Sequence, residues 1–254
     1  MQKSKSGIVK TDAEIEIMKT AGLICAQALK EVLTNVKVGV NCGELDKIAH
    51  LEINKRSAQP SFMTVEDYKY TICTTINEQV VHGIPNERIL KNGDILGIDI
   101  GALYRGYHSD LAISVPVGKI SKENKKFLKV GEETLNMAIK KAIIGGYIGD
   151  ISSTIEDSII GAGYSIVKNL TGHGVGRELH EDPMIPGFGK PKTGPKILEN
   201  MVLAIEVIYT SGTGKVIVEK DGWTISAADG SLGGLFEKTV AISKNGPIVL
   251  TPYL

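Results

Sequence analysis

The sequence is poor in cysteine and lacks long apolar runs. Its 254 residues include only Cys25, Cys42 and Cys73, an odd number without CxxC spacing. This argues against a disulfide framework and favours reduced thiols in a cytosolic protein. The longest apolar runs, such as MVLAI and AIIGGYIG, are too short to span a membrane.

The chain also lacks an excess of charge of either sign. Its 29 basic and 29 acidic residues give a formal net charge of +0, so electrostatic attraction to nucleic acid is not expected. The first ten residues, MQKSKSGIVK, have no apolar h-region, so we expect no signal peptide. With 42% hydrophobic and 23% charged residues, the composition is that of a globular protein of one large or two small domains.

Local signals predict where the helices begin. We expect a flexible arm over residues 1–10, followed by a helix that starts at a capping box of Thr11 and Glu14 and ends near Asn35. Further helices are expected at three later capping residues, which are Asn41, Ser121 and, after a break at Gly149, Asp150.

The remaining segments are strand-like, and the order of elements contains a weak internal repeat. A shift of about 110 residues places Gly39 on Gly149 and Leu45 on Ile155. Each half, about 11–120 and 121–254, would then be a helix, a glycine break, a second helix and strands. Two such halves would build one sheet with its helices outside, related by a pseudo-twofold axis.

Residues 97–115, GIDIGALYRGYHSDLAISV, predict a β-hairpin that carries two carboxylates. An even-numbered loop over residues 103–106 would place Asp99 opposite Asp110, on one sheet face among small residues. Like charges placed opposite each other are destabilising, so a bound divalent cation is one interpretation. The other is two solvated aspartates on an exposed face, and the hairpin alone leaves both open.

Two later strand-like segments carry a glutamate each. Glu206 lies within the apolar run MVLAIEVIY, where a carboxylate is costly to bury unless it is paired or bound to metal. A half-exposed strand is the alternative, but Ala204 and Ile208 would share its face, which favours a site. Glu237, in LFEKTV, is by itself more typical of a solvated strand residue.

Histidines supply the remaining candidates. His173 and His180 lie in TGHGVGRELHEDP, where glycines allow close approach of backbone or ligand, but their spacing does not fit an HExxH zinc helix. His82 is a third candidate, whereas His50 and His108 are expected to be structural. Together with the acids, this oxygen-rich set without thiolate suits two hard or borderline divalent ions.

As a set, five motifs resemble those of the pita-bread metallopeptidases, in particular their type I methionine aminopeptidase branch, over residues 10–254. The motifs are NEQVVHGIP, GDILGIDIGALYRGYHSD, GHGVGRELHED, KDGWT and FEKTV. The resemblance implies an α+β, single-domain pita-bread fold, with a pseudo-twofold antiparallel sheet and helices packed on its outer face.

The resemblance implies five metal ligands, namely Asp99, Asp110, His173, Glu206 and Glu237. By this resemblance Asp110 and Glu237 bridge two divalent ions (Co, Mn, Fe or Zn), Asp99 holds one, and His173 with Glu206 holds the other. A water or hydroxide between the ions would attack the scissile carbonyl, with Glu206 exchanging its proton.

The resemblance also implies substrate contacts. His82 and His180 would contact the substrate and the developing oxyanion. The pocket for a methionine side chain would be formed by Phe62, Tyr68, Cys73 and Trp223. The activity implied is removal of the N-terminal methionine from nascent proteins when the second residue is small. A cytoplasmic monomer would act near the ribosome, without binding nucleic acid or membrane.

The sequence departs from the common family pattern at Leu179, at Val207 and over residues 60–70, and these departures concern selectivity more than chemistry. Two alternatives share the fold. A prolidase or aminopeptidase P usually carries a further N-terminal domain, whereas only ten residues precede the shared fold here. A non-enzymatic pita-bread binding protein would lose metal ligands and gain basic surface, and this chain shows neither.

Overall fold

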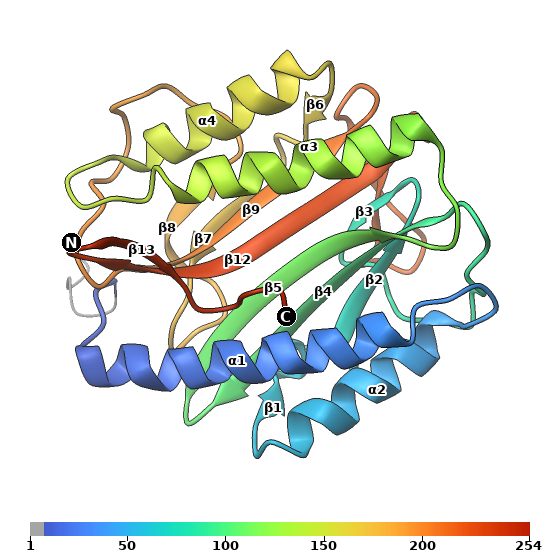
Figure 1. The fold of residues 1–254 in the computed structure, drawn as a ribbon, viewed down its shortest axis with the longest axis horizontal. Helices are drawn as coiled ribbons and strands as arrows, with labels where there is room; N and C mark the ends of the chain where they lie inside the picture. The colour runs from blue at the N-terminus through green and yellow to red at the C-terminus, as the bar shows by residue number, and fades with distance from the viewer. Residues whose placement is uncertain (1–7) are drawn as a thin grey trace.

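The computed structural model describes residues 8–254 as one large sheet covered on one face by four helices (Figure 1). The helices are α1 (Asp12–Thr34), α2 (Cys42–Asn54), α3 (Lys122–Ile139) and α4 (Ile148–Gly161). The ten strands of the large sheet are β1 (Gln59–Pro60), β2 (Ile72–Ile76), β4 (Ile95–Tyr104), β5 (Tyr107–Pro116), β6 (Ser165–Ile166), β7 (Thr171–Gly174), β8 (Glu181–Pro186), β9 (Val202–Thr210), β12 (Gly233–Ser243) and β13 (Gly246–Val249).

The large sheet is antiparallel throughout the described chain, with the order β1-β4-β5-β12-β9-β7-β8. In addition, β2 pairs with β4, β6 pairs with β9, and β13 pairs with β12. A second sheet contains three strands, β3 (Gln79–Val81), β10 (Val216–Val218) and β11 (Ile225–Ala227). A short 3₁₀ helix spans Phe62–Thr64. The expected α+β fold is confirmed.

The first three helices begin at the predicted capping residues. At α1, the Thr11 hydroxyl accepts the Glu14 N–H (3.3 Å) and the Glu14 carboxylate accepts the Thr11 N–H (2.7 Å), which completes the capping box. Asn41 caps α2 and Ser121 caps α3 in the same way, each through its side-chain oxygen.

The prediction for α4 is wrong. Tyr147 is its N-cap, Gly149 lies within its first turn, and the Asp150 carboxylate accepts the Tyr147 N–H (2.8 Å). An acidic residue favours both the cap and the first turn, where it faces unpaired backbone N–H groups. The residue type therefore did not distinguish the two positions.

The central hairpin differs from the predicted register by two residues. β4 and β5 are joined by a two-residue turn in which Arg105 and Gly106 both have positive φ (48° and 81°), the backbone that matches the twist of the flanking strands. Asp99 therefore pairs with Ala112, and Asp110 pairs with Gly101. A shift of two residues preserves alternation, so both carboxylates still point to the same face.

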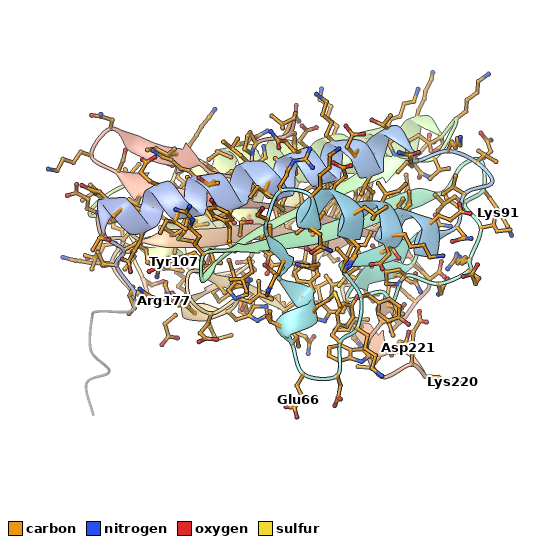
Figure 2. All side chains as sticks on the ribbon, turned by 90° about the horizontal axis from the view of Figure 1, so that it is seen from below. Glu66, Lys91, Tyr107, Arg177, Lys220 and Asp221 are labelled. Carbon is orange, nitrogen blue, oxygen red and sulfur yellow. The ribbon has the colours of Figure 1, made fainter. Side chains whose placement is uncertain are left out.

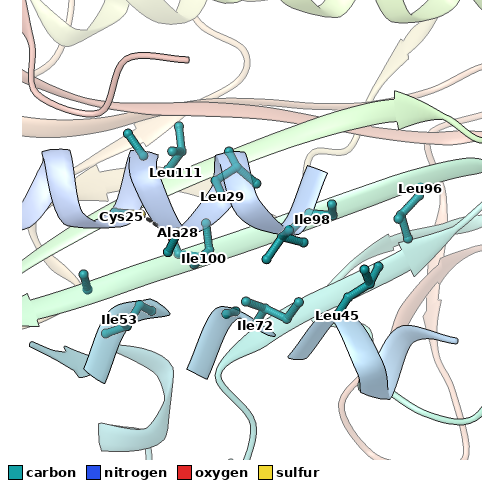
Figure 3. Packing of buried hydrophobic residues seen from close by; sticks show 14 of the residues in the cluster. Cys25, Ala28, Leu29, Leu45, Ile53, Ile72, Leu96, Ile98, Ile100 and Leu111 are labelled. Atoms are coloured by element: carbon teal, nitrogen blue, oxygen red, sulfur yellow. Dashed lines mark hydrogen bonds between the residues drawn. The ribbon is translucent and has the colours of Figure 1, made fainter. Parts of the chain in front are cut away.

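An apolar layer joins the helices to the sheet and assigns its faces. Leu29 of α1 and Leu45 of α2 belong to one buried cluster with Ile98 and Ile100 of β4 (Figure 3). The Cys25 thiol donates to the Ile100 carbonyl (3.0 Å) across this layer. A second cluster joins α3 and α4 to β9 and β12, and it includes Phe127, Ile151, Leu203, Ile205 and Phe236. Asp99 and its neighbours in the site therefore lie on the opposite face of the sheet.

The two halves of the chain repeat a helix pair followed by strands. Isolated bridges at Asn41–Ile89 and Tyr147–Lys196 mark the start of the second helix in each half. These bridges align Asn41 with Tyr147, so the predicted offset is wrong by about four residues, one helical turn, at this helix. The division into residues 11–120 and 121–254 stays a prediction.

The beginning of the described chain packs against the sheet. Of the predicted flexible arm, residues 1–7 lie outside the described residues, whereas Val9 bridges Met201 and Lys10 is buried. All three cysteines are free and buried, as expected for reduced thiols. Within residues 8–254, no helix has the length and apolar character needed to cross a membrane.

Candidate metal centre

A cavity of about 340 Å³ opens on the sheet face away from the helices. All eleven residues that the sequence singled out as site residues line it, although they come from widely separated segments. They are Phe62, Tyr68, Cys73, His82, Asp99, Asp110, His173, His180, Glu206, Trp223 and Glu237. His50 and His108 lie elsewhere, each beside a hydroxyl at 3.0 Å.

Strand pairing places three acids in one row across the floor of the cavity. Cys73 of β2 pairs with Asp99 of β4, which pairs with Ala112 of β5. Ala112 in turn pairs with Glu237 of β12, which pairs with Glu206 of β9. Side chains in one row project to the same face, so Asp99, Glu237 and Glu206 converge.

Asp110, two residues before Ala112 on β5, is the fourth acid of this group. Its backbone N–H donates to the Thr239 hydroxyl (2.9 Å), and that hydroxyl donates back to the Asp110 carbonyl (2.8 Å). Its Oδ1 accepts the Leu111 N–H (3.1 Å), whereas its Oδ2 lies 3.9 Å from His173 Nε2. Asp110 and Glu237 are buried, at 4% and 3% exposure.

Removal from water raises the pKa of all four carboxyls. The pKa of Asp99 rises to about 7, chiefly through desolvation. Desolvation is also the largest cause for Asp110, Glu206 and Glu237, and the charges of the neighbouring acids raise the pKa of each further. Four carboxylates held this close therefore need positive charge before all of them ionise at neutral pH.

His173 presents a neutral imidazole nitrogen to this group. Its Nδ1 donates to the Gly174 carbonyl (2.9 Å), which fixes the tautomer and leaves a lone pair on Nε2. Desolvation lowers the pKa of His173 to about 4, so the ring is uncharged at neutral pH. Nε2 lies 3.9 Å from Asp110 Oδ2 and 4.0 Å from Glu237 Oε1, where a lone pair faces two acceptors.

These observations fit a divalent cation. Donor atoms of Asp110, His173 and Glu237 all lie within 4.8 Å of one another. Asp99 Oδ1 and Glu237 Oε1 are buried without any hydrogen-bond partner, which is costly for a carboxylate oxygen unless a cation contacts it. Oxygen donors with one imidazole suit Mn, Fe, Co or Zn.

An apolar pocket adjoins the acidic row. Its buried members form one cluster, with Trp223 packed at the edge, and they are Phe62, Tyr68, Cys73 and Leu179. The Tyr68 and Trp223 rings meet edge-on with centroids 5.0 Å apart, and the Tyr68 hydroxyl donates to the Ile72 carbonyl (2.9 Å). Because Cys73 pairs with Asp99, this pocket begins directly beside the carboxylates.

The two further histidines lie at the exposed rim of the cavity. The His180 ring lies 4.4 Å from the His173 ring, edge to face, and burial lowers the pKa of His180. His82 follows the end of β3 with a φ of 57°, and it also lines the cavity. Both can therefore reach a molecule that occupies the space above the acids.

Several cavity residues had no recognisable signal in the sequence. Asn169 and Leu170 line the cavity from the segment between β6 and β7, Thr171 lines it from the start of β7, and Met184 lines it from β8 with 62% exposure. Leu179 was noted only as a departure from the family pattern, yet it is buried in the aromatic cluster. These residues lie in ordinary loop or strand sequence, and only the fold brings them to the site.

An antiparallel sheet with two helix pairs on one face and a carboxylate-lined cavity on the other defines a metallopeptidase of the pita-bread class. The sequence pattern of metallopeptidase family M24 matches residues 16–244, and the chain belongs to that family.

Curated relatives and solved structures agree with this assignment. The chain is 43% identical to a methionine aminopeptidase of Clostridium acetobutylicum and 43% identical to methionine aminopeptidase 1 of Bacillus subtilis, each over 96% of this chain and 98% of the relative. It is similar to the crystal structure of methionine aminopeptidase from Thermotoga maritima, with a TM-score of 0.94, 39% identity and coverage of 96% and 98%. Prolidase from Pyrococcus furiosus matches with a TM-score of 0.76 and 26% identity, over 96% of this chain and 65% of that one.

Proposed function

We propose that this protein is a methionine aminopeptidase, which removes the N-terminal methionine from polypeptides whose second residue is small. One observation carries the proposal: a row of acidic residues and an apolar, aromatic pocket open into the same cavity and meet at Cys73 and Asp99. The row would bind the reacting amide, and the pocket would select the first side chain.

The proposed ion ligands are Asp99, Asp110, His173, Glu206 and Glu237. Asp110 and Glu237 would be shared between two ions, as the family resemblance implies. When bound, divalent ions lower the pKa of a water molecule toward neutrality and polarise a carbonyl group. Glu206, at the end of the acidic row, would accept a proton from the attacking water and pass it to the leaving amine.

The histidines at the rim would act on the substrate carbonyl. His180 lies beside His173, and its ring N–H would donate to the oxygen that becomes negative as the carbonyl is attacked. His82, which lines the same cavity, would hold the substrate. In the apolar pocket, Tyr68 and Trp223 would contact the methionine side chain, because sulfur–aromatic contacts are favourable.

The charges that line the cavity favour an aminopeptidase over a dipeptidase. A free α-amine would be held at the ion site, whereas no lysine or arginine is among the described residues that line the cavity. A dipeptidase needs a cation for the C-terminal carboxylate of its substrate. We therefore expect the chain to act on the amino end of longer peptides, including nascent polypeptides near the ribosome, as a cytoplasmic monomer.

A peptide panel tests the proposal. The purified protein, supplied in turn with Mn, Fe, Co or Zn, is incubated with Met-Ala-Ser, Met-Leu-Ser, Leu-Ala-Ser and Ala-Pro, and free amino acids are measured. Release of methionine from Met-Ala-Ser but not from Met-Leu-Ser supports the proposal. Cleavage confined to Ala-Pro would instead indicate a prolidase, and absence of cleavage with every metal would refute both activities.

A further inference from the structure

A buried ion pair joins the first residues of the described chain to the loop that carries His180. Lys10 Nζ lies 2.6 Å from Glu181 Oε2, and the two side chains are only 4% and 14% exposed. The Lys10 backbone N–H also donates to the Asn200 carbonyl (2.9 Å), beside the Val9–Met201 bridge. Lys10 is therefore fixed to the sheet by its backbone while its side chain reaches Glu181.

The loop of residues 175–180 is built around this ion pair. Glu181 follows His180 directly, and its second carboxylate oxygen accepts the Glu178 N–H (3.2 Å) from within the loop. At Gly176 an added Cβ would lie 2.4 Å from Lys10 Cε and 2.7 Å from both Lys10 Nζ and Glu181 Oε1. The loop backbone thus passes against the ammonium group, and a side chain at Gly176 would have to displace the paired ends of Lys10 and Glu181.

A second contact holds the outer side of the same loop. Arg177 donates to the Glu14 carboxylate (3.0 Å), and its guanidinium stacks over the Tyr107 ring at 4.7 Å. Figure 2 shows Tyr107 and Arg177 together at one end of the molecule. Tyr107 also hydrogen-bonds Glu14, which the Thr11 capping box already fixes. Both tethers therefore originate from the segment that begins α1.

We infer that Lys10 and Glu181 form a positioning pair that holds residues 175–180, and through them His180, at the rim of the cavity. The loop has little regular structure of its own, and its cavity-facing residues, Leu179 and His180, are the last two before Glu181. Loosening the ion pair would displace His180 without touching the acidic row. What His180 does to the substrate rests on the proposed function; the tether itself does not.

The first test measures the tether without any activity. Hydrogen exchange of the metal-free protein is compared for the natural sequence, Lys10→Met and Glu181→Gln, with Arg56→Met as the control. Arg56 pairs with Glu52 of α2, away from this loop. The control variant therefore also removes one ion pair, but not one that contacts residues 175–180. We expect amides of residues 175–180 to exchange about 10-fold faster in the first two variants and unchanged in the control. Unchanged exchange in both variants would overturn the inference.

The second test asks whether Lys10 acts through His180. Displacing a catalytic group by about 1 Å can cost about 100-fold in rate, so Lys10→Met should lower kcat by about 10- to 100-fold, with a smaller change in KM. In the His180→Ala background the same substitution should change kcat less than about twofold, because coupled residues are not additive. An equal loss in both backgrounds would overturn the positioning role.

The two tests separate this inference from the proposed function. If the natural sequence cleaves no peptide with any metal, the proposed function fails, and hydrogen exchange still decides whether the ion pair holds the loop. If cleavage is normal but neither exchange nor kcat responds to Lys10→Met and Glu181→Gln, the inference fails alone. Glu181→Gln keeps an acceptor for the Glu178 N–H, so it guards against a general folding defect.

Discussion

Asp99→Asn in the metal-free protein tests the electrostatics of the acidic row directly. The folded-state pKa of Asp99 is raised from 3.8 to about 7, mainly because the carboxyl is withdrawn from water. A raised pKa means that the folded state binds the proton more tightly than the unfolded state, so stability is lost as pH rises above the unfolded pKa. The loss is complete near the folded pKa of about 7.

The magnitude follows from the shift. A difference of roughly three pKa units corresponds to about 4 kcal/mol of unfolding free energy, of which about 3 kcal/mol accumulates between pH 5 and pH 8. Asparagine has nearly the same shape and cannot ionise, so the variant escapes this loss. We expect the metal-free variant to gain about 3 kcal/mol relative to the natural sequence over that pH interval.

Buried histidines act in the opposite direction, which is why the difference between two proteins is measured. The pKa values of His108 and His173 are lowered to about 4, so each adds stability as pH rises toward its unfolded value. Both histidines are present in each protein, and most of their contribution cancels.

Urea unfolding in EDTA from pH 5 to pH 8 supplies the free energies, and the same series with excess Mn²⁺ supplies the comparison. Metal binding should reverse the order at pH 8, because a ligand for the folded state stabilises it and the variant lacks one ion contact. Parallel pH profiles without metal would refute the reasoning, as would a variant that is less stable than the natural sequence at pH 8 in EDTA.

Three further substitutions test separate parts of the proposed site. Asp110→Ala should bind at most one ion per chain by elemental analysis, and two ions would contradict its role between them. His180→Ala should lower kcat by about 100- to 1,000-fold, as loss of an oxyanion donor does, and an effect confined to KM would assign it to ground-state binding. Trp223→Ala should raise KM for Met-Ala-Ser by about 3- to 10-fold, since an aromatic contact contributes about 0.5–1.5 kcal/mol. An unchanged KM would place Trp223 outside the methionine pocket.

Local chemistry made much of this fold predictable from the sequence. The Thr11 capping box and the caps at Asn41 and Ser121 depend on residues three positions apart, and each is present as expected. The start of α4 was missed because Asp150 is equally suited to a cap and to a first turn. Local rules thus succeed where one residue type has one favourable place.

Strand register was less accessible, because it depends on the backbone of the turn. Arg105 at positive φ gives no strong sequence signal, and a loop of four residues was equally consistent with the hairpin pattern. The prediction of the shared face survived because both loops have an even length, whereas the partners of Asp99 and Asp110 changed. The shared face of the two carboxylates was therefore predictable from the sequence, but their cross-strand partners were not.

Glu237 shows why the complete site required the fold. Its local sequence is typical of a solvated strand, yet β12 is flanked by β5 and β9, so its side chain is buried between residues that are distant along the chain. The same pairing places small Ala112 between Asp99 and Glu237, which leaves space above the row. The helices bury the opposite face, so the sheet tolerates four destabilising carboxyls on one side because apolar packing stabilises the other. Cation binding would then recover stability that the row alone removes, and for this reason the metal-free protein should report the site through its pH dependence.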